Sequence, residues 1–534
     1  MSLQSLPPEI ISHIADRLGS IHDLFNLLRV NKTLFHILIH DLYRNNIRSD
    51  GGSALVWYAG RGCEPGVSRM LDAGADINVR SPNEVQSTAL LEAVLHKHTH
   101  IVRLLLARGA LPDAADLRAR RPLSVAASGR NDAAITHALL DFGARPNALA
   151  FEKRAPLTEA IRTNQASQVA LLLQHGASVQ VFRDRNTLLH VAAAKNAAPA
   201  IMEMLIDSGV PVDAPDGLGM TPLQVAAAHS CVRAVRLLLR YGADPNCRVA
   251  IDYARRPTAL FFAPAKPRSR RKDNTAVIRA LISHGAQVNA MNSEGKTPLS
   301  VAVAAGAIKH AQALLDMGAS VMARDAGGDT VLHLAAASRS CRPDLLAWLV
   351  GKGADVNAVC GSRKETPLFS VIRNWGHIGM EWRAGVDCAQ TLVSLGANVN
   401  VQNAEGLTPL SLAVRKGYVG LSALLLQSGA VVDVRDSRGR TPLHHVAQDC
   451  LGYQAQELCV LLIANGADVH SRDHSGYTAL HRLVGRELWE AVGELLRAGA
   501  DRYAMTYDGR FPFDMVPPGP WAETKRQFLC YYAQ

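Results

Sequence analysis

The chain of 534 residues has no long apolar run, and aromatic residues make up only 5% of it. A membrane span needs roughly 20 predominantly apolar residues, whereas the runs of Ala and Leu here are broken every few positions by Gly, Arg, His or Asp. Few aromatics beside abundant Ala, Leu, Gly and Val favour closely packed helices over a β-sandwich. We therefore expect an all-α protein with no transmembrane segment.

Cysteine is also sparse. Nine cysteines are scattered without a C-x-x-C pair, which is typical of reduced thiols in a cytosolic or nuclear protein. The first residues lack the basic and apolar regions of a secretory signal, so we expect a cytoplasmic or nuclear location. Only 19% of residues are charged, but the formal net charge is +10, a balance that favours acidic partners or nucleic acid.

Sequence signatures of catalysis are missing as well. The chain has no glycine-rich phosphate loop, no G-x-S-x-G elbow, no H-E-x-x-H and no kinase motif set. Its carboxylates and histidines recur at a regular spacing and form no privileged pair. We expect a binding protein that is not an enzyme and has no cofactor, metal or small-molecule substrate.

One unit, repeated along the chain, fills most of the sequence. Segments such as DSRGRTPLHHVAQ and DGLGMTPLQVAAA share a frame, and each is followed by an apolar stretch that ends in Gly-Ala or Gly-Val. Thirteen such pairs occur, most often 33 residues apart, which indicates a stacked array of repeats. Their glycines are Gly74, Gly109, Gly143, Gly176, Gly209, Gly242, Gly285, Gly318, Gly353, Gly396, Gly429, Gly466 and Gly499.

The residue types of this unit predict two helices. Thr can cap a first helix by accepting a hydrogen bond from a free amide of the first turn, and the Pro after it suits the first helical position. Val235, Leu238 and Leu239 show the i, i+3, i+4 spacing of a second helix. Gly242 then supplies a left-handed C-cap.

This frame resembles the ankyrin repeat, whose T-P-L-H signature stands here as Thr441-Pro442-Leu443-His444. The resemblance covers residues 51–516 and implies antiparallel helix pairs with projecting loops, stacked into a solenoid whose concave face binds an unidentified protein target. Residues 517–534 are expected to form a C-terminal capping helix. By the family pattern, hydrogen bonds within and between loops are the role of His190, His333, His444 and His481.

Three units, which end at Gly285, Gly396 and Gly466, are longer than the rest. We expect their added residues to enlarge the turn between the paired helices. The first of these insertions holds the densest positive segment, which fits a nuclear localisation signal or a patch for acidic ligands. We favour the alternative of a solvated surface loop, and the lack of interleaved aromatics argues against nucleic acid. Its basic residues are Lys266, Arg268, Arg270, Arg271 and Lys272.

His96, His98 and His100 alternate along the chain, which raises the question of a metal site. Counted from Thr88, they fall at the junction between the two helices of their repeat. Alternation does not place three imidazoles on one helical face. We therefore predict turn residues, not metal ligands.

Residues 3–45 lack the repeated frame, but their apolar residues still show helical spacing in three short segments. Their order resembles the F-box, with its opening at Leu6-Pro7-Pro8-Glu9-Ile10 and its Asp-Leu at Asp23-Leu24. The resemblance implies a three-helix domain, residues 1–50, that docks onto the Skp-type adaptor of a cullin ubiquitin ligase. The residues it assigns to or near that contact are Leu6, Pro7, Pro8, Glu9, Ile10, Ile14, Leu24, Leu28 and Val30.

Two hypotheses follow from these features. In the first, the N-terminal domain binds the ligase adaptor and the solenoid binds a target for ubiquitination. In the second, the chain is an ankyrin scaffold or regulator without a ligase link, and residues 1–50 only cover the first repeat. The variable positions of such arrays set which target they bind.

Overall fold

The computed structural model describes residues 43–44, 46–48, 51–129, 133–180, 186–248, 257–263, 274–338, 341–374, 382–448, 450, 452–519 and 522–531. The chain divides into two compact units, residues 1–244 and 245–534, which we describe separately. Within the described residues the regular structure is helical, apart from two isolated bridges, Arg80 with Thr88 and Arg324 with Thr330. None of the described helices combines the length and the apolar character that crossing a membrane requires.

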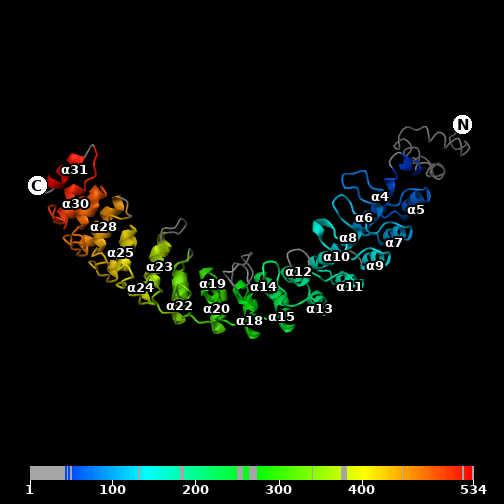
Figure 1. The fold of residues 1–534 in the computed structure, drawn as a ribbon, viewed down its shortest axis with the longest axis horizontal. Coiled ribbons are helices and arrows are strands. Elements are labelled where there is room, and N and C mark those ends of the chain that lie inside the picture. The colour runs from blue at the N-terminus through cyan, green and yellow to red at the C-terminus, as the bar shows by residue number, and fades with distance from the viewer. Residues whose placement is uncertain are drawn as a thin grey trace, which may run out of the picture. The chain divides into compact units, whose positions relative to one another are not determined.

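The first unit is a stack of helix pairs, in which the first helices form one row and the second helices another (Figure 1). The first helices are α4 (Ala54–Arg61), α6 (Ala89–Leu95), α8 (Pro122–Ser128), α10 (Pro156–Arg162), α12 (Leu188–Lys195) and α14 (Pro222–Ala228). The second helices are α5 (Glu64–Asp72), α7 (Thr99–Ala107), α9 (Ala133–Asp141), α11 (Ala166–Gln174), α13 (Pro199–Asp207) and α15 (Val232–Arg240). A short 3₁₀ helix, η2 (Phe151–Lys153), lies in one of the loops.

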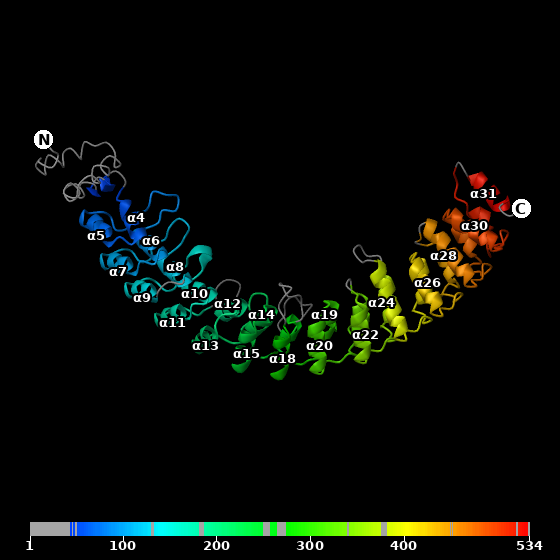
Figure 2. The ribbon, with the colours of Figure 1, turned by 180° about the vertical axis from the view of Figure 1, so that it is seen from behind.

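The second unit repeats this arrangement, as the reverse view also shows (Figure 2). Its first helices are α17 (Ala259–Phe262), α19 (Pro298–Ala304), α21 (Val331–Ala336), α23 (Pro367–Asn374), α25 (Pro409–Arg415), α27 (Pro442–His445) and α29 (Ala479–Gly485). Its second helices are α18 (Thr275–Ser283), α20 (Ile308–Asp316), α22 (Pro343–Gly351), α24 (Trp382–Ser394), α26 (Val419–Gln427), α28 (Gly452–Ala464) and α30 (Trp489–Arg497). At the end of the chain come η3 (Pro512–Met515) and α31 (Ala522–Tyr531).

Helix boundaries follow the residue types that predict them. The Thr221 hydroxyl accepts a hydrogen bond from the amide of Gln224 at 3.3 Å, and Pro222 occupies the first helical position. Gly242 adopts a φ of 84°, the left-handed conformation expected of a C-cap glycine. The core between the two rows is built from small and branched apolar side chains, as expected for helices that approach closely.

Two of the longer repeats differ from the expectation. The helices α24 and α28 each have 13 residues, whereas the second helices of the 33-residue repeats have nine. Part of the added sequence therefore lengthens the second helix by one turn at its N-terminal end, instead of only enlarging the preceding turn. In the repeat with the basic insertion, α18 keeps nine residues, and residues 264–273 lie outside the described part.

The loops between repeats are joined to one another at their tips by backbone hydrogen bonds. The amide of Ser437 donates to the carbonyl of Glu405 at 3.0 Å, and the amide of His474 donates to Arg438 at 3.0 Å. In the same way the amide of Ala404 donates to the carbonyl of Arg363 at 2.9 Å. We use the name loop face for the surface formed by these loops and the first helices.

Candidate functional site

Each of four histidines connects the capping threonine of its own repeat to the next repeat. In the second-last repeat the amide of Thr441 donates to Nδ1 of His444 at 3.2 Å, and Nε2 of His444 lies 3.0 Å from the carbonyl oxygen of Tyr477. Because Nδ1 accepts, Nε2 must carry the proton and donate, which fixes the neutral tautomer. Equivalent contacts are made by His190, His333 and His481. The role predicted for these histidines is confirmed.

Burial keeps these rings uncharged. It lowers the pKa of His444 to about 4, against smaller opposing effects of the Tyr477 carbonyl and Asp473. Burial also lowers the pKa of His190, His333 and His481. The four rings therefore serve as neutral hydrogen-bonding links between repeats, not as acid–base groups.

A second set of links uses the asparagine that stands four residues after the glycine of the Gly-Ala pair in six of the units. Oδ1 of Asn400 accepts from the amide of Val431 at 2.8 Å, and its Nδ2 donates to the carbonyl of Gly429 at 3.0 Å. Asn147, Asn246, Asn289 and Asn357 repeat both contacts. Sequence reasoning missed this role, although the recurrence of Asn at one place in the unit was a visible signal.

Aspartate replaces asparagine in three of these links, at Asp113, Asp213 and Asp433. Oδ2 of Asp213 accepts from the amide of Asp244 at 3.0 Å, and Oδ2 of Asp433 accepts from Asp468 at 2.9 Å. In both residues Oδ1 is buried without a hydrogen-bond partner. Burial raises the pKa of both carboxyls because it disfavours the charged form. Unlike the Asn amide, an ionised carboxylate cannot donate a hydrogen bond.

Arginine forms a third set of links, six residues before the capping threonine in three repeats. One amino group (NH1) of Arg435 donates to the carbonyl of Gly439 in its own loop at 3.2 Å and to Arg472 in the next at 2.6 Å. Arg324 makes the same two kinds of contact, and Arg472 reaches the carbonyl of Met505. These guanidinium groups hold consecutive loops in register, a role that the sequence analysis did not assign.

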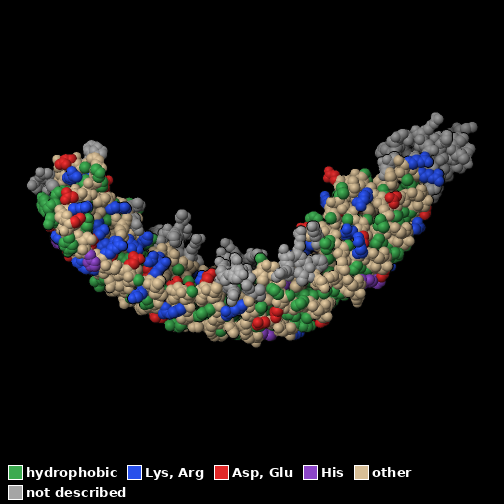
Figure 3. Space-filling model, viewed as in Figure 1, with side chains coloured by type: hydrophobic (Ala, Val, Ile, Leu, Met, Phe, Trp, Pro, Cys, Tyr) green, Lys and Arg blue, Asp and Glu red, His purple; other side chains and the backbone are tan. Residues whose placement is uncertain are grey.

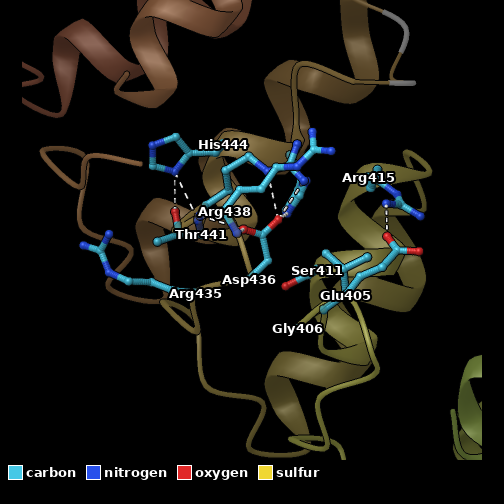
Figure 4. Close-up of polar contacts among 12 residues, drawn as sticks. Glu405, Gly406, Ser411, Arg415, Arg435, Asp436, Arg438, Thr441 and His444 are labelled. Carbon is cyan, nitrogen blue, oxygen red and sulfur yellow. Dashed lines mark hydrogen bonds and ion pairs between the residues drawn. The ribbon is translucent and has the colours of Figure 1, made fainter. Parts of the chain in front are cut away.

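The most buried ionic cluster of the loop face surrounds Asp436 (Figure 4). Its side chain is 1% exposed, and Oδ2 lies 2.8 Å from both Nε and NH2 of Arg440 and 3.2 Å from Nε2 of His445. Burial alone would raise the pKa of Asp436, but hydrogen bonds from His445, from Arg440 and from the Arg438 amide together hold it well below its usual range. Asp436 is therefore ionised, and its charge neutralises that of Arg440.

Neighbouring repeats contain related pairs of a loop carboxylate and a helix arginine. The buried Glu365 accepts from Nε of Arg373 at 2.8 Å, and the buried Asp473 pairs with Arg482. Glu405 differs, since it is exposed and pairs with Arg415 at 3.2 Å (Figure 4). Arg363 and Arg438 stand exposed on the loops, and no described carboxylate forms an ion pair with either guanidinium. Lys and Arg side chains gather around α25 on the face shown in Figure 3.

The loop face of the first unit has a different character. A cavity of about 720 Å³ opens beside the exposed Trp57, lined also by Arg61, Glu92 and His96. The Arg61 guanidinium lies 5.4 Å from the centre of the Trp57 ring, a cation–π contact. Exposed apolar side chains stand on three of the following loops, namely Leu117, Phe151 and Leu218.

His96 and His98 lie at the junction of α6 and α7, as predicted, and His100 is the second residue of α7. Their ring centroids are 6.3 and 6.2 Å apart, so the rings form a row and are closer together than alternation suggested. Each points to a different acceptor, because His96 faces Glu92, His98 lies 3.1 Å from the Gly60 carbonyl and His100 lies 3.3 Å from that of Gly62. His98 and His100 therefore contact the preceding repeat, whereas His96 contacts its own helix.

Asp329, His333 and Cys360 bring three potential ligand atoms within 4.8 Å of one another. Both ring nitrogens of His333 are already used, one by the Thr330 amide and the other by the Glu365 carbonyl. The histidines at 190, 444 and 481 have the same two contacts without a cysteine beside them. We therefore assign His333 to the links between repeats and not to a metal site.

The residues that the sequence analysis proposed for adaptor binding and for a nuclear signal lie outside the described part of the chain. The first group is Leu6, Pro7, Pro8, Glu9, Ile10, Ile14, Leu24, Leu28 and Val30, and the second is Lys266, Arg268, Arg270, Arg271 and Lys272. Both assignments stay predictions.

The repeated sequence matches known families. The family described as ankyrin repeats (3 copies) matches residues 180–249, 269–360 and 377–473, and the single ankyrin repeat matches residues 86–117. A structure of the human ASB11 ankyrin repeat domain aligns at 26% identity with a TM-score of 0.36, covering 44% of this chain and 98% of that one.

Curated relatives match over part of their length. The B-cell lymphoma 3 protein homolog of Mus musculus is 32% identical over 50% of this chain and 49% of its own. The human ankyrin repeat and SOCS box protein 16 is 30% identical over 42% of this chain and 46% of its own. The putative palmitoyltransferase ZDHHC13 of Danio rerio is 30% identical over 28% of this chain and 21% of its own. This chain thus spans less than half of the length of each of these relatives.

Proposed function

Because this chain is an ankyrin-repeat protein, we propose that it binds a target protein through the loop face and presents it to a Skp–cullin–F-box ubiquitin ligase. The ligase link is carried by one observation, the F-box-like order of residues from Leu6 to Val30 in front of the array. Holding target and ligase together raises their effective concentration, so the chemistry would come from its partners and none from this chain. Such a role would place it in the cytoplasm or nucleus.

The array supports this proposal through its rigidity and its varied surface. Three sets of side-chain links fix the register of consecutive loops, whereas the loop tips carry residues that change from repeat to repeat. A rigid frame with variable tips is suited to protein recognition. The human relative named ankyrin repeat and SOCS box protein 16 likewise carries ankyrin repeats and a further module, in its case a SOCS box.

A pull-down of a purified Skp-type adaptor with the full chain tests the ligase link. We expect Leu6→Ala with Pro7→Ala to weaken recovery of the adaptor, because both side chains would be buried in that contact. The matched control is Leu218→Ala, which removes an exposed leucine of the array. Unchanged recovery by the double variant, or by a chain that lacks residues 1–40, would refute the ligase link.

A second candidate, an ankyrin scaffold with an N-terminal cap, is favoured by the contacts of residues 43–48. Tyr43 is buried with its ring centroid 6.0 Å from that of Tyr58, and Oδ1 of Asn46 accepts from the amide of Ala54 at 3.0 Å. This short segment therefore covers the start of α4. A cap must shield the open apolar side of a terminal repeat.

Removal of residues 1–40 separates the two candidates, since it leaves Tyr43 and Asn46 in place. A cap formed by the removed residues predicts a lower thermal midpoint for the shortened chain. If residues 1–40 instead bind the ligase adaptor, the shortened chain should keep its thermal midpoint and lose adaptor binding. Differential scanning calorimetry and the pull-down on the same preparation give both readings.

A further inference from the structure

We propose that the loop face between residues 361 and 486 binds an acidic segment of a partner protein, with Asp and Glu side chains as the groups it recognises. The inference rests on the proposed function only in taking the array as the partner-binding part, and it does not depend on the ligase link. The accessible cationic residues of these loops and first helices include Arg363, Lys364, Arg373, Lys416, Arg438 and Arg482.

Three of the six described acids on these loops are buried, which leaves more cationic than acidic side chains exposed on this surface. The side chains of Glu365, Asp436 and Asp473 are 4%, 1% and 3% exposed, and each pairs with an arginine. Of the other described acids on these loops, Glu405 and Asp468 are exposed and Asp433 is half-buried. A partner approaching from solvent therefore meets more guanidinium and ammonium groups than carboxylates.

The buried carboxylates also fix the arginines that remain accessible. Arg373 and Arg482 are held by Glu365 and Asp473, and each keeps about a third of its side chain exposed (31%). A guanidinium that is already held in place loses less conformational entropy when it binds a second carboxylate. This geometry favours charge-assisted, two-pronged hydrogen bonds to Asp and Glu.

A cavity next to this surface offers room for one acidic side chain. It has a volume of about 400 Å³ and lies between the loop around Arg363 and the end of α23. Arg373, Ser370 and Asn374 contribute to its wall. Asp329 and Glu365 also line this cavity. Glu365 is paired with Arg373, which leaves the Arg363 guanidinium for an added carboxylate.

The arrangement favours an acidic peptide over nucleic acid. The exposed Glu405 lies between the repeats of Arg363 and Arg438 and would repel a continuous phosphodiester backbone. Among the described tips and first helices of this region, no Phe, Trp or Tyr is exposed. Single-stranded nucleic acids are usually held by stacking on such side chains.

Fluorescence anisotropy of a labelled peptide of alternating Glu and Ser, titrated with the full chain, tests the proposal. We expect binding that weakens with added salt, and little binding of the peptide in which Gln replaces Glu. Arg363→Glu with Arg438→Glu should weaken binding by about tenfold or more, because two charge-assisted contacts become repulsive. Both residues are exposed, so circular dichroism should show an unchanged fold.

The matched control is Arg233→Glu with Arg236→Glu, the same charge change on exposed positions of α15 in the first unit. Equal weakening by this control, or unchanged binding by the Arg363 and Arg438 variant, would overturn the proposal. Tighter binding of oligo-deoxythymidine than of the Glu peptide would overturn it too. The Leu6 and Pro7 variant should bind the Glu peptide normally, so failure of the ligase link and failure of this inference can be told apart.

Discussion

The two units present different side chains on the same frame. In residues 51–244 the exposed positions of the loop face include Trp57, Leu117, Phe151 and Leu218, whereas in residues 361–486 they include Arg363, Lys364, Arg438 and Arg472. The links between repeats are shared, since both units use histidine and asparagine in the same contacts. The comparison separates the residues that hold the array from those that give each part of it a surface chemistry.

The largest effect is expected where the units differ in the burial of an ion pair. Asp436→Ala leaves Arg440, whose side chain is 10% exposed, without its partner and should destabilise the second unit by about 3 kcal/mol. The matched change in the first unit is Asp116→Ala, whose partner Arg120 is 31% exposed and can reach water. We expect about 1 kcal/mol there. Urea unfolding with hydrogen exchange resolved by segment measures both, and equal losses would contradict this interpretation.

Acid should destabilise the second unit more than the first. Three linking histidines with lowered pKa, His333, His444 and His481, lie in the second unit, and His190 lies in the first. Since the unfolded chain takes up protons below pH 6.5 and these buried rings do so only at lower pH, stability falls as the pH drops below 6.5. For His444, with a pKa of about 4, the loss at pH 5 is about 2 kcal/mol.

Hydrogen exchange at pH 7 and pH 5 tests this expectation. Amides of residues 331–484 should lose more protection than amides of residues 89–228. As a control, His444→Gln keeps a side chain that can both accept and donate, and it should reduce the pH dependence. A uniform loss of protection across both units would argue against the histidines as its cause.

Glycine-to-alanine substitutions at one position in each unit should give smaller differences in stability. A Cβ on Gly406 would lie 2.6 Å from the backbone nitrogen of Ser437 in the next loop, while a Cβ on Gly242 would meet no atom within 4 Å. Both have positive φ, so Gly242→Ala should cost about 1–2 kcal/mol from conformation alone. Gly406→Ala should cost more, because the two loops must also separate. Thermal midpoints of the two variants would show the difference, and a smaller shift for Gly406→Ala would contradict it.

The smallest expected effect is a gain in stability. Asp213→Asn in the first unit and Asp433→Asn in the second should each stabilise by about 1 kcal/mol at pH 7, because the amide supplies the missing donor. Since burial raises the pKa of both Asp residues, the wild-type penalty is present above the folded pKa and disappears in acid. The gain should therefore shrink as the pH approaches 4, and urea midpoints at several pH values would show it. A gain independent of pH would contradict the assignment.

The sequence predicted the repeated helix pairs and the threonine caps, because each depends on residues close together in one repeat. The histidine links, which join neighbouring repeats, were expected from the resemblance to the ankyrin repeat. The sequence did not reveal the double contact of Arg435 or the burial of Asp436. Those features depend on how one loop lies against the next, which spacing along the chain does not show. The extra turn of α24 and α28 was also missed, since a longer turn and a longer helix add the same number of residues.

The hydrogen bonds between loop tips have a consequence for how this protein could change. Ser437 donates through its amide and Glu405 accepts through its carbonyl, so neither bond uses a side chain. A substitution at a tip therefore keeps the bond to the next loop, provided that the backbone conformation suits the new residue. Substitutions can therefore change partner preference one repeat at a time, while the stacking of the repeats is kept.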